Sequence, residues 1–86
     1  MGRLLATPGA LKALDEANTP ADEYLERHGS ADWGEALCEE DRKANDRALE
    51  GGGRLLSAYR LPTGKKLWII TEADRSASTV LTPEEY

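Results

Sequence analysis

The chain has 86 residues, the size of one small domain, which excludes an enzyme built from two domains with a cleft between them. Its hydrophobic fraction of 40% and charged fraction of 31% are near those of globular proteins, so we expect a single folded domain over residues 1–86. The net charge of −5 indicates a surface that, taken as a whole, repels a nucleic-acid backbone.

The charge is unevenly distributed along the sequence. Residues 1–50 contain six basic and twelve acidic side chains, whereas residues 51–86 contain five basic and four acidic ones. We therefore distinguish an acidic half from a nearly balanced half. Because surface charge governs solubility and association, we expect the acidic half to select the partner.

Two Thr-Pro pairs mark the starts of the first two predicted helices. Thr7-Pro8 and Thr19-Pro20 each combine a capping side chain with a proline whose fixed φ suits the first helical position. The apolar spacing after them predicts short helices over 8–17 and 20–28, with Gly29 as the stop of the second.

A third helix is predicted over 35–50, after a glycine-containing loop. Its charged residues greatly outnumber its apolar ones, which is typical of a helix on the surface. Trp33 in the preceding loop fits either the core or an interface, and the sequence leaves both open. The run Gly51-Gly52-Gly53 ends the helix and does not precede one, so it is not a phosphate-binding loop.

After Gly53 the spacing of apolar residues changes from a helical period to two-residue alternation. This predicts strands over 54–61, 65–72 and 78–82, with a hairpin loop at 62–64 and Trp68 inside the core. The expected fold is α+β in two layers: three N-terminal helices, then a three-stranded antiparallel β-meander. The acidic helical half covers 1–50 and the antiparallel sheet 54–82.

The remaining composition bears on compartment and cofactors. A single cysteine, Cys38, permits no internal disulfide, and the longest strongly apolar run spans only residues 67–70, so we expect a cytoplasmic protein. One His and one Cys fall short of the ligands that zinc takes, and we expect no metal and no cofactor. The acidic neighbours of Cys38 disfavour its thiolate and a nucleophilic role.

Several segments carry a resemblance to a known family. They are Asp32-Trp33-Gly34, the runs from Glu39 to Leu49, from Gly53 to Tyr59 and from Leu67 to Ser76, and the closing run from Leu81 to Tyr86. In these segments the chain resembles a family of small uncharacterised plasmid-related proteins encoded on bacterial plasmids and integrative mobile elements. The resemblance implies a bacterial, mobile-element setting, where toxins, antitoxins and inhibitors of host defence are common; it implies no catalytic residue.

The leading hypothesis is a small acidic, non-enzymatic binding protein. Its acidic helical face would dock on a protein partner with a basic surface and inhibit a host nucleic-acid-handling or defence complex, in the manner of anti-restriction or anti-CRISPR proteins. The residues predicted to bind the partner are Glu35, Glu39, Glu40, Asp41, Glu23 and Glu26. The simpler interpretation is a solvated helical surface that keeps a small domain soluble.

Two alternatives remain. His28, Tyr59 and Arg75 could supply the base, acid and cation of a small ribonuclease toxin with the architecture of RelE and colicin nucleases, although His28 on an apolar stripe is also typical of a buried hydrogen-bonding histidine. The other alternative is a structural module that forms a homodimer through a free edge of the sheet.

Overall fold

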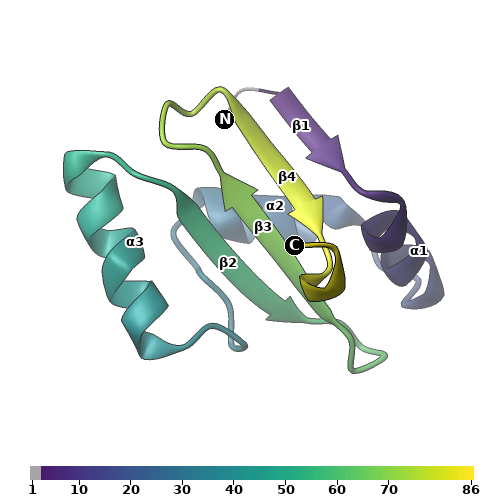
Figure 1. Cartoon of the computed structure of the whole chain (residues 1–86). Helices are drawn as coiled ribbons and strands as arrows, with labels where there is room; N and C mark the ends of the chain where they lie inside the picture. Colours follow the sequence, from purple (N-terminus) through teal and green to yellow (C-terminus); the bar gives the residue numbers. More distant parts are fainter. Residues whose placement is uncertain (1–2) are drawn as a thin grey trace.

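The computed structural model describes residues 3–86, which form a four-stranded sheet with helices behind it and beside it (Figure 1). In chain order the elements are β1 (Arg3–Ala6), α1 (Pro8–Glu16), α2 (Ala21–Gly29), α3 (Glu39–Gly51), β2 (Leu55–Arg60), β3 (Lys66–Thr71), β4 (Ala77–Leu81) and the short 3-10 helix η1 (Pro83–Glu85). The strand order across the sheet is β1-β4-β3-β2.

The α+β class is confirmed, but the predicted order of three helices followed by a three-stranded meander is wrong. Strand β1 precedes the helices and pairs in parallel with β4, so the sheet is mixed and has four strands. Its sequence, Arg-Leu-Leu-Ala, lacks alternation and all four residues are exposed, so it carries no local strand signal. It becomes a strand because β4, from the other end of the chain, offers it backbone partners.

The first Thr-Pro pair caps its helix as predicted, and the second does not. The Thr7 hydroxyl accepts a hydrogen bond from the Ala10 N–H, with Pro8 in the first turn of α1. At α2 the residue before the helix is Pro20, and the Thr19 hydroxyl donates instead to the carbonyl of Ala17. Thr19 therefore stabilises the link between the helices and leaves α2 without a side-chain cap.

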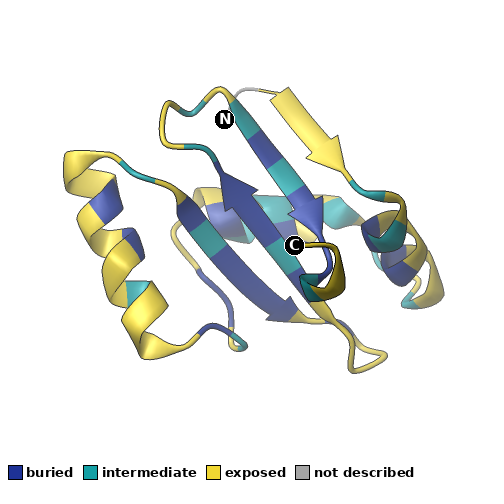
Figure 2. Ribbon diagram, viewed as in Figure 1, coloured by how far each residue is buried: buried dark blue, intermediate teal, exposed yellow. Residues whose placement is uncertain are grey.

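The two faces of the sheet differ in what covers them. Side chains on one face pack against α1 and α2 and form the main core, in which Tyr59, Leu67 and Ile69 are fully buried. Figure 2 shows this burial running along β2, β3 and β4, whereas β1 is exposed throughout. A smaller cluster around Trp33, half-buried Trp68 and the inner side of α3 extends to the opposite face. Trp33 therefore belongs to the core, and Trp68 only to its margin.

The outer edge of β2 is covered by the loop before α3 and by α3 itself. The Ala58 N–H donates to the Trp33 carbonyl at 2.9 Å, and the Ala58 carbonyl accepts from the Ala36 N–H at 3.1 Å. Two residues before Ala58 on the same strand, the Leu56 carbonyl accepts from the buried Asn45 amide, and the Leu56 N–H donates to it. Since residues 33–36 run beside β2, α3 begins only at Glu39, four residues later than predicted.

Replacing Asn45 by Ala should lower the free energy of unfolding by about 1.5 kcal/mol, because both backbone groups of Leu56 lose their partner in a partly buried place. Urea denaturation measures this. The control is Asp46→Ala on the exposed side of the same helix, which should stay within about 0.5 kcal/mol of the parent protein. Equal losses for both variants would contradict a specific role of the Asn45 amide.

The C-terminal segment is tied to the start of α1. The Glu85 carboxylate accepts from the Thr7 hydroxyl at 2.5 Å and from the Gly9 N–H at 3.1 Å. It also accepts from the backbone and hydroxyl of Thr82, which completes a capping box for η1. These contacts, the Thr7 hydroxyl first, lower the pKa of the Glu85 carboxyl to about 2. They also fix the place of Tyr86, which follows directly.

Candidate functional site

The predicted partner-binding residues are divided between two elements and the loop joining them. Glu23 and Glu26 lie on α2, which crosses behind the sheet, whereas Glu39, Glu40 and Asp41 form the first turn of α3 beside β2 (Figure 1). All five are exposed, and no salt bridge in residues 3–86 involves them. They therefore form two separate acidic groups.

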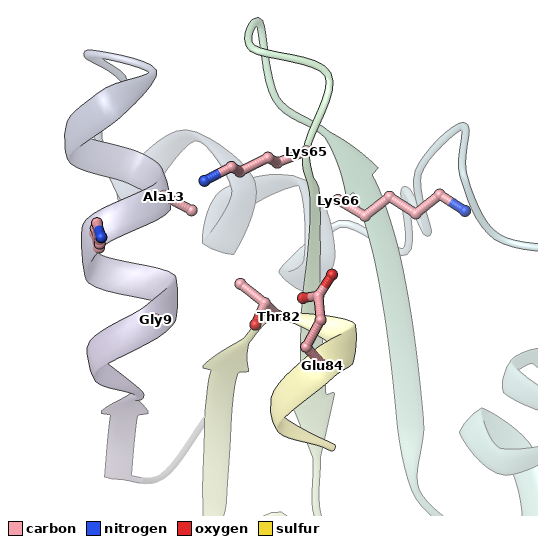
Figure 3. Close-up of a pocket in the computed structure, with 7 residues that line it drawn as sticks. Gly9, Ala13, Lys65, Lys66, Thr82 and Glu84 are labelled. Atoms are coloured by element: carbon pink, nitrogen blue, oxygen red, sulfur yellow. The ribbon is translucent and has the colours of Figure 1, made fainter.

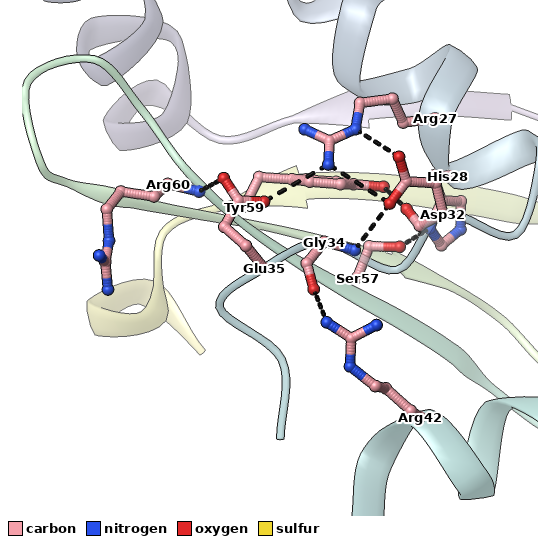
Figure 4. A network of polar contacts seen from close by, with 9 residues as sticks. All are labelled: Arg27, His28, Asp32, Gly34, Glu35, Arg42, Ser57, Tyr59 and Arg60. Carbon is pink, nitrogen blue, oxygen red and sulfur yellow. Dashed lines mark hydrogen bonds and ion pairs between the residues drawn. The ribbon is translucent and has the colours of Figure 1, made fainter. Parts of the chain in front are cut away.

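Glu35, the sixth residue of the set, has a structural role in the loop. Its carboxylate accepts from the Arg60 N–H at 3.3 Å and forms an ion pair with Arg27 at 3.4 Å (Figure 4). Partial burial opposes the charge, but the backbone N–H groups and Arg27 together lower the pKa of Glu35. Because these contacts hold the loop against β2, Glu35 is less free to bind a partner than the other five.

Arg27 is the centre of this network. Its Nε donates to Asp32 at 2.8 Å, and its guanidinium carbon lies 4.7 Å from the ring centre of Tyr59. The hydrogen bond from Arg27 is the main reason that the pKa of Asp32 lies below its ordinary value. On the other side of the loop, Arg42 donates to the carbonyl of Gly34 (Figure 4). The loop between α2 and α3 is thus held by polar contacts with two arginines, one from each helix.

His28 is the centre of a buried polar chain on the helix-covered face. Its Nδ1 lies 2.5 Å from the Ser57 hydroxyl and its Nε2 lies 2.7 Å from the Thr71 hydroxyl, which in turn contacts Ser78 at 2.8 Å. Neutral imidazole has one donor and one acceptor, and hydroxyls can take either role. Burial lowers the pKa of His28 to about 4, so at neutral pH the ring is uncharged and both nitrogens have partners.

The other two members of the alternative catalytic set also have structural partners. Tyr59 is fully buried, its hydroxyl donates to the Asp32 carbonyl at 2.6 Å, and burial raises its pKa to about 12. Arg75 donates to the carbonyls of Gly53 at 2.6 Å and Ala48 at 3.2 Å, and so holds the end of α3. The structure brings Arg75 and His28 to one hollow of about 220 Å³, whose lining does not include Tyr59.

Three lysines line another hollow, beside the start of α1. It has a volume of about 270 Å³ and is lined by Gly9, Lys12, Ala13, Lys65, Lys66, Thr82 and Glu84. Figure 3 shows Lys65 directed toward α1, while Lys66 extends in the opposite direction. Lys65 is paired with Glu16 at 2.8 Å, and Glu84 lies within the hollow. The positive charges therefore do not converge on one point.

The face of the sheet turned away from α1 and α2 was not predicted as a site. It carries a hollow of about 220 Å³ lined by Arg54, Leu56, Trp68, Ile70 and Tyr86. The sequence does indicate this lining, because two-residue alternation places Arg54, just before β2, on the same side of the chain as Leu56. The prediction that Trp68 lies inside the core gives no reason to expect a site on this face.

Residues 3–86 hold no cluster of metal ligands and no helix able to span a membrane, and their single cysteine is exposed. No three His, Cys, Asp or Glu side chains converge there as metal ligands. Cys38 is exposed and its thiol donates to Asp41 at 3.2 Å. Within the same range, every helix is too short or too polar to cross a membrane.

Comparison with known proteins brings no further assignment. No family model matches the chain, and no curated protein or solved structure matches it either.

Proposed function

We propose that the protein is a non-enzymatic binding protein that docks the acidic first turn of α3 on a basic surface of a partner protein. The observation that supports this most is the run Glu39, Glu40 and Asp41, three consecutive exposed carboxylates outside every salt bridge found in residues 3–86. Charges of one sign gathered at a helix end attract an oppositely charged surface and orient it before contact.

The position of α3 supports this assignment. The helix packs against β2 through buried Asn45 and Ala48, and most of its other residues are exposed. Glu23 and Glu26 on α2 are two carboxylates three positions apart, whereas the first turn of α3 presents three in succession. We therefore assign α2 a secondary part in binding.

The partner we propose is a host nucleic-acid-handling or defence complex of bacteria. This choice rests on the resemblance to plasmid-related proteins together with the charge pattern. Complexes that bind nucleic acid use lysine and arginine to contact phosphates. A row of carboxylates can occupy such a basic surface and block it, which is the mode of action proposed for this protein.

The experiment compares the parent protein with E39K/E40K/D41K as immobilised bait in a bacterial lysate. We expect the parent to retain a protein whose binding weakens steeply with salt, because exposed charges are screened beyond a Debye length of about 10 Å at 0.1 M salt. With the purified partner, the charge reversal should reduce affinity at least about tenfold, which corresponds to about 1.4 kcal/mol.

The matched control is D15K/E50K/E84K, which changes the net charge equally at exposed sites outside the first turn of α3. It should keep most of the affinity. Lysines at a helix start also oppose the helix dipole by about 0.3–1 kcal/mol each, so E39Q/E40Q/D41N is measured in parallel, with circular dichroism to verify folding. Retention of the same partner by E39K/E40K/D41K at high salt would refute the proposal.

A further inference from the structure

The face of the sheet turned away from α1 and α2 has a distinct composition. The register of β2, β3 and β4 places one set of alternating side chains on it: Leu56, Ala58, Arg60, Lys66, Trp68, Ile70, Thr79 and Leu81. In Figure 1 this face is turned toward the viewer, bordered by α3 on one side and partly overlaid by η1. We call it the open face.

The centre of the open face is an aromatic groove. Trp68 from the central strand and Tyr86 meet edge to face, with ring centres 5.6 Å apart. The Arg54 guanidinium carbon lies 5.9 Å from the Tyr86 ring centre, and Leu56 and Ile70 complete the lining. Tyr86 is 70% exposed, so its ring is available to a partner. Tryptophan, tyrosine and arginine are the residues most enriched in binding hot spots.

Beyond one end of the groove, two like charges lie opposite each other on the open face. Arg60 and Lys66 are direct cross-strand partners, both exposed, and neither belongs to any salt bridge in residues 3–86, although Lys66 also lines the hollow beside α1 that contains Glu84. Like charges placed opposite each other on a sheet destabilise it. A carboxylate between the two side chains would remove this repulsion, so this end of the groove is suited to an acidic group.

The other end has acidic residues. Arg54 is paired with Glu72 at 3.7 Å, and a neighbouring hollow of about 200 Å³ shares Arg54 and Tyr86 with the groove and adds Glu72 and Glu85. A nucleic-acid strand that stacked on Trp68 would carry successive phosphates toward these carboxylates, on a molecule of net charge −5. The charge pattern therefore disfavours a uniform polyanion and fits a segment with an acidic end and an apolar middle.

We infer that the open face binds a short segment of a partner protein, with an apolar side chain against Trp68 and Tyr86 and a carboxylate between Arg60 and Lys66. This surface prefers acidic ligands, opposite in sign to those of the first turn of α3. It is therefore a second binding surface, and its failure in a test would leave the proposal for Glu39 to Asp41 unaffected.

The test is a selection of random short peptides displayed on phage against the immobilised full chain. We expect enriched peptides that combine Asp or Glu with a neighbouring aromatic or leucine. Synthetic copies of these peptides should shift the amide resonances of β2 and β3 in a titration followed by NMR. Binding to R60E/K66E should be at least about tenfold weaker, because the charge pair then repels the ligand.

Three further variants make the result specific. Tyr86→Ala removes an exposed side chain, so it tests the groove without disturbing the core, and it should also weaken binding about tenfold. K43E/R47E changes the net charge as much as R60E/K66E does, but on exposed residues of α3, and should leave peptide affinity within about twofold. Trp68→Ala is compared only if its melting curve shows a folded protein.

Several outcomes would overturn the inference. These are the absence of enriched acidic peptides, enriched peptides that bind R60E/K66E as well as the parent, or shifts confined to α2 and α3. Two more outcomes identify a different occupant and equally reject the peptide: a single-stranded oligonucleotide that shifts the same β2 and β3 resonances, and self-association in sedimentation that is lost in Tyr86→Ala.

Discussion

Replacing Gly34 by Ala should lower the free energy of unfolding by about 4 kcal/mol, a large part of the total stability of a small domain. Gly34 has φ +93°, where a side chain costs about 1–2 kcal/mol. A Cβ atom there would also overlap the carbonyl oxygen of Ala58 and the ring of Tyr59, at about 1–3 kcal/mol. The Ala58 carbonyl cannot easily move, because it accepts from the Ala36 N–H.

The matched control is Gly64→Ala in the hairpin loop. Gly64 has the same φ of +93°, but a Cβ atom there would meet nothing within 4 Å. It should therefore show the conformational cost alone, about 1–2 kcal/mol. Urea denaturation of both variants separates the overlap at Gly34 from the backbone strain that the two positions share. Similar losses would mean that the loop before α3 does not lie against β2.

The predictions from sequence succeeded where local chemistry determines the structure. Thr7 and Pro8 place the start of α1 because a cap and a fixed φ act within one turn. The alternation of β2 and β3 and the loop at residues 62–64 define a hairpin in the same way, and its two strands lie within about a residue or two of the predicted ranges. These features need no information from distant parts of the chain.

The predictions failed where a segment owes its structure to a distant partner. Arg3–Ala6 is a strand only through β4, and residues 33–36 extend beside β2 although Glu35 was assigned to a helix. The same applies to the site. Exposure of Glu39 to Asp41 follows from the helical pattern, but the use of Glu35 by Arg27 and Arg60 depends on how the loop lies on the sheet.

The two edges of the sheet differ in how far they are covered. The edge of β2 is covered by Trp33, Ala36 and Asn45, so the homodimer proposed as an alternative would have to use β1. That strand is only four residues long and exposed on all of them, including Leu4 at 56%. Short edge strands are a common way to limit unwanted pairing. A second copy of the chain would therefore find only a short row of free backbone groups at this edge.

Acidification below neutral pH should destabilise the protein through His28. Its pKa is about 4 when folded and about 6.5 in the ordinary state, so between these values the unfolded chain binds more protons. The free energy of unfolding therefore falls as the pH decreases through this interval. A shift of this size corresponds to a loss of about 2 kcal/mol between about pH 7 and about pH 5.

The replacement His28→Gln tests whether the imidazole is responsible. Glutamine keeps a donor and an acceptor near Ser57 and Thr71 but does not titrate, so the variant should be less stable at neutral pH and nearly independent of pH between about 7 and about 5. The carboxyls with lowered pKa, such as Asp32 and Glu85, lose their contribution only as the pH falls through and below about 4. A parent protein whose urea midpoint does not change over the upper interval would show that His28 is not buried in the neutral form. An equal pH dependence in both proteins would assign the loss to other groups.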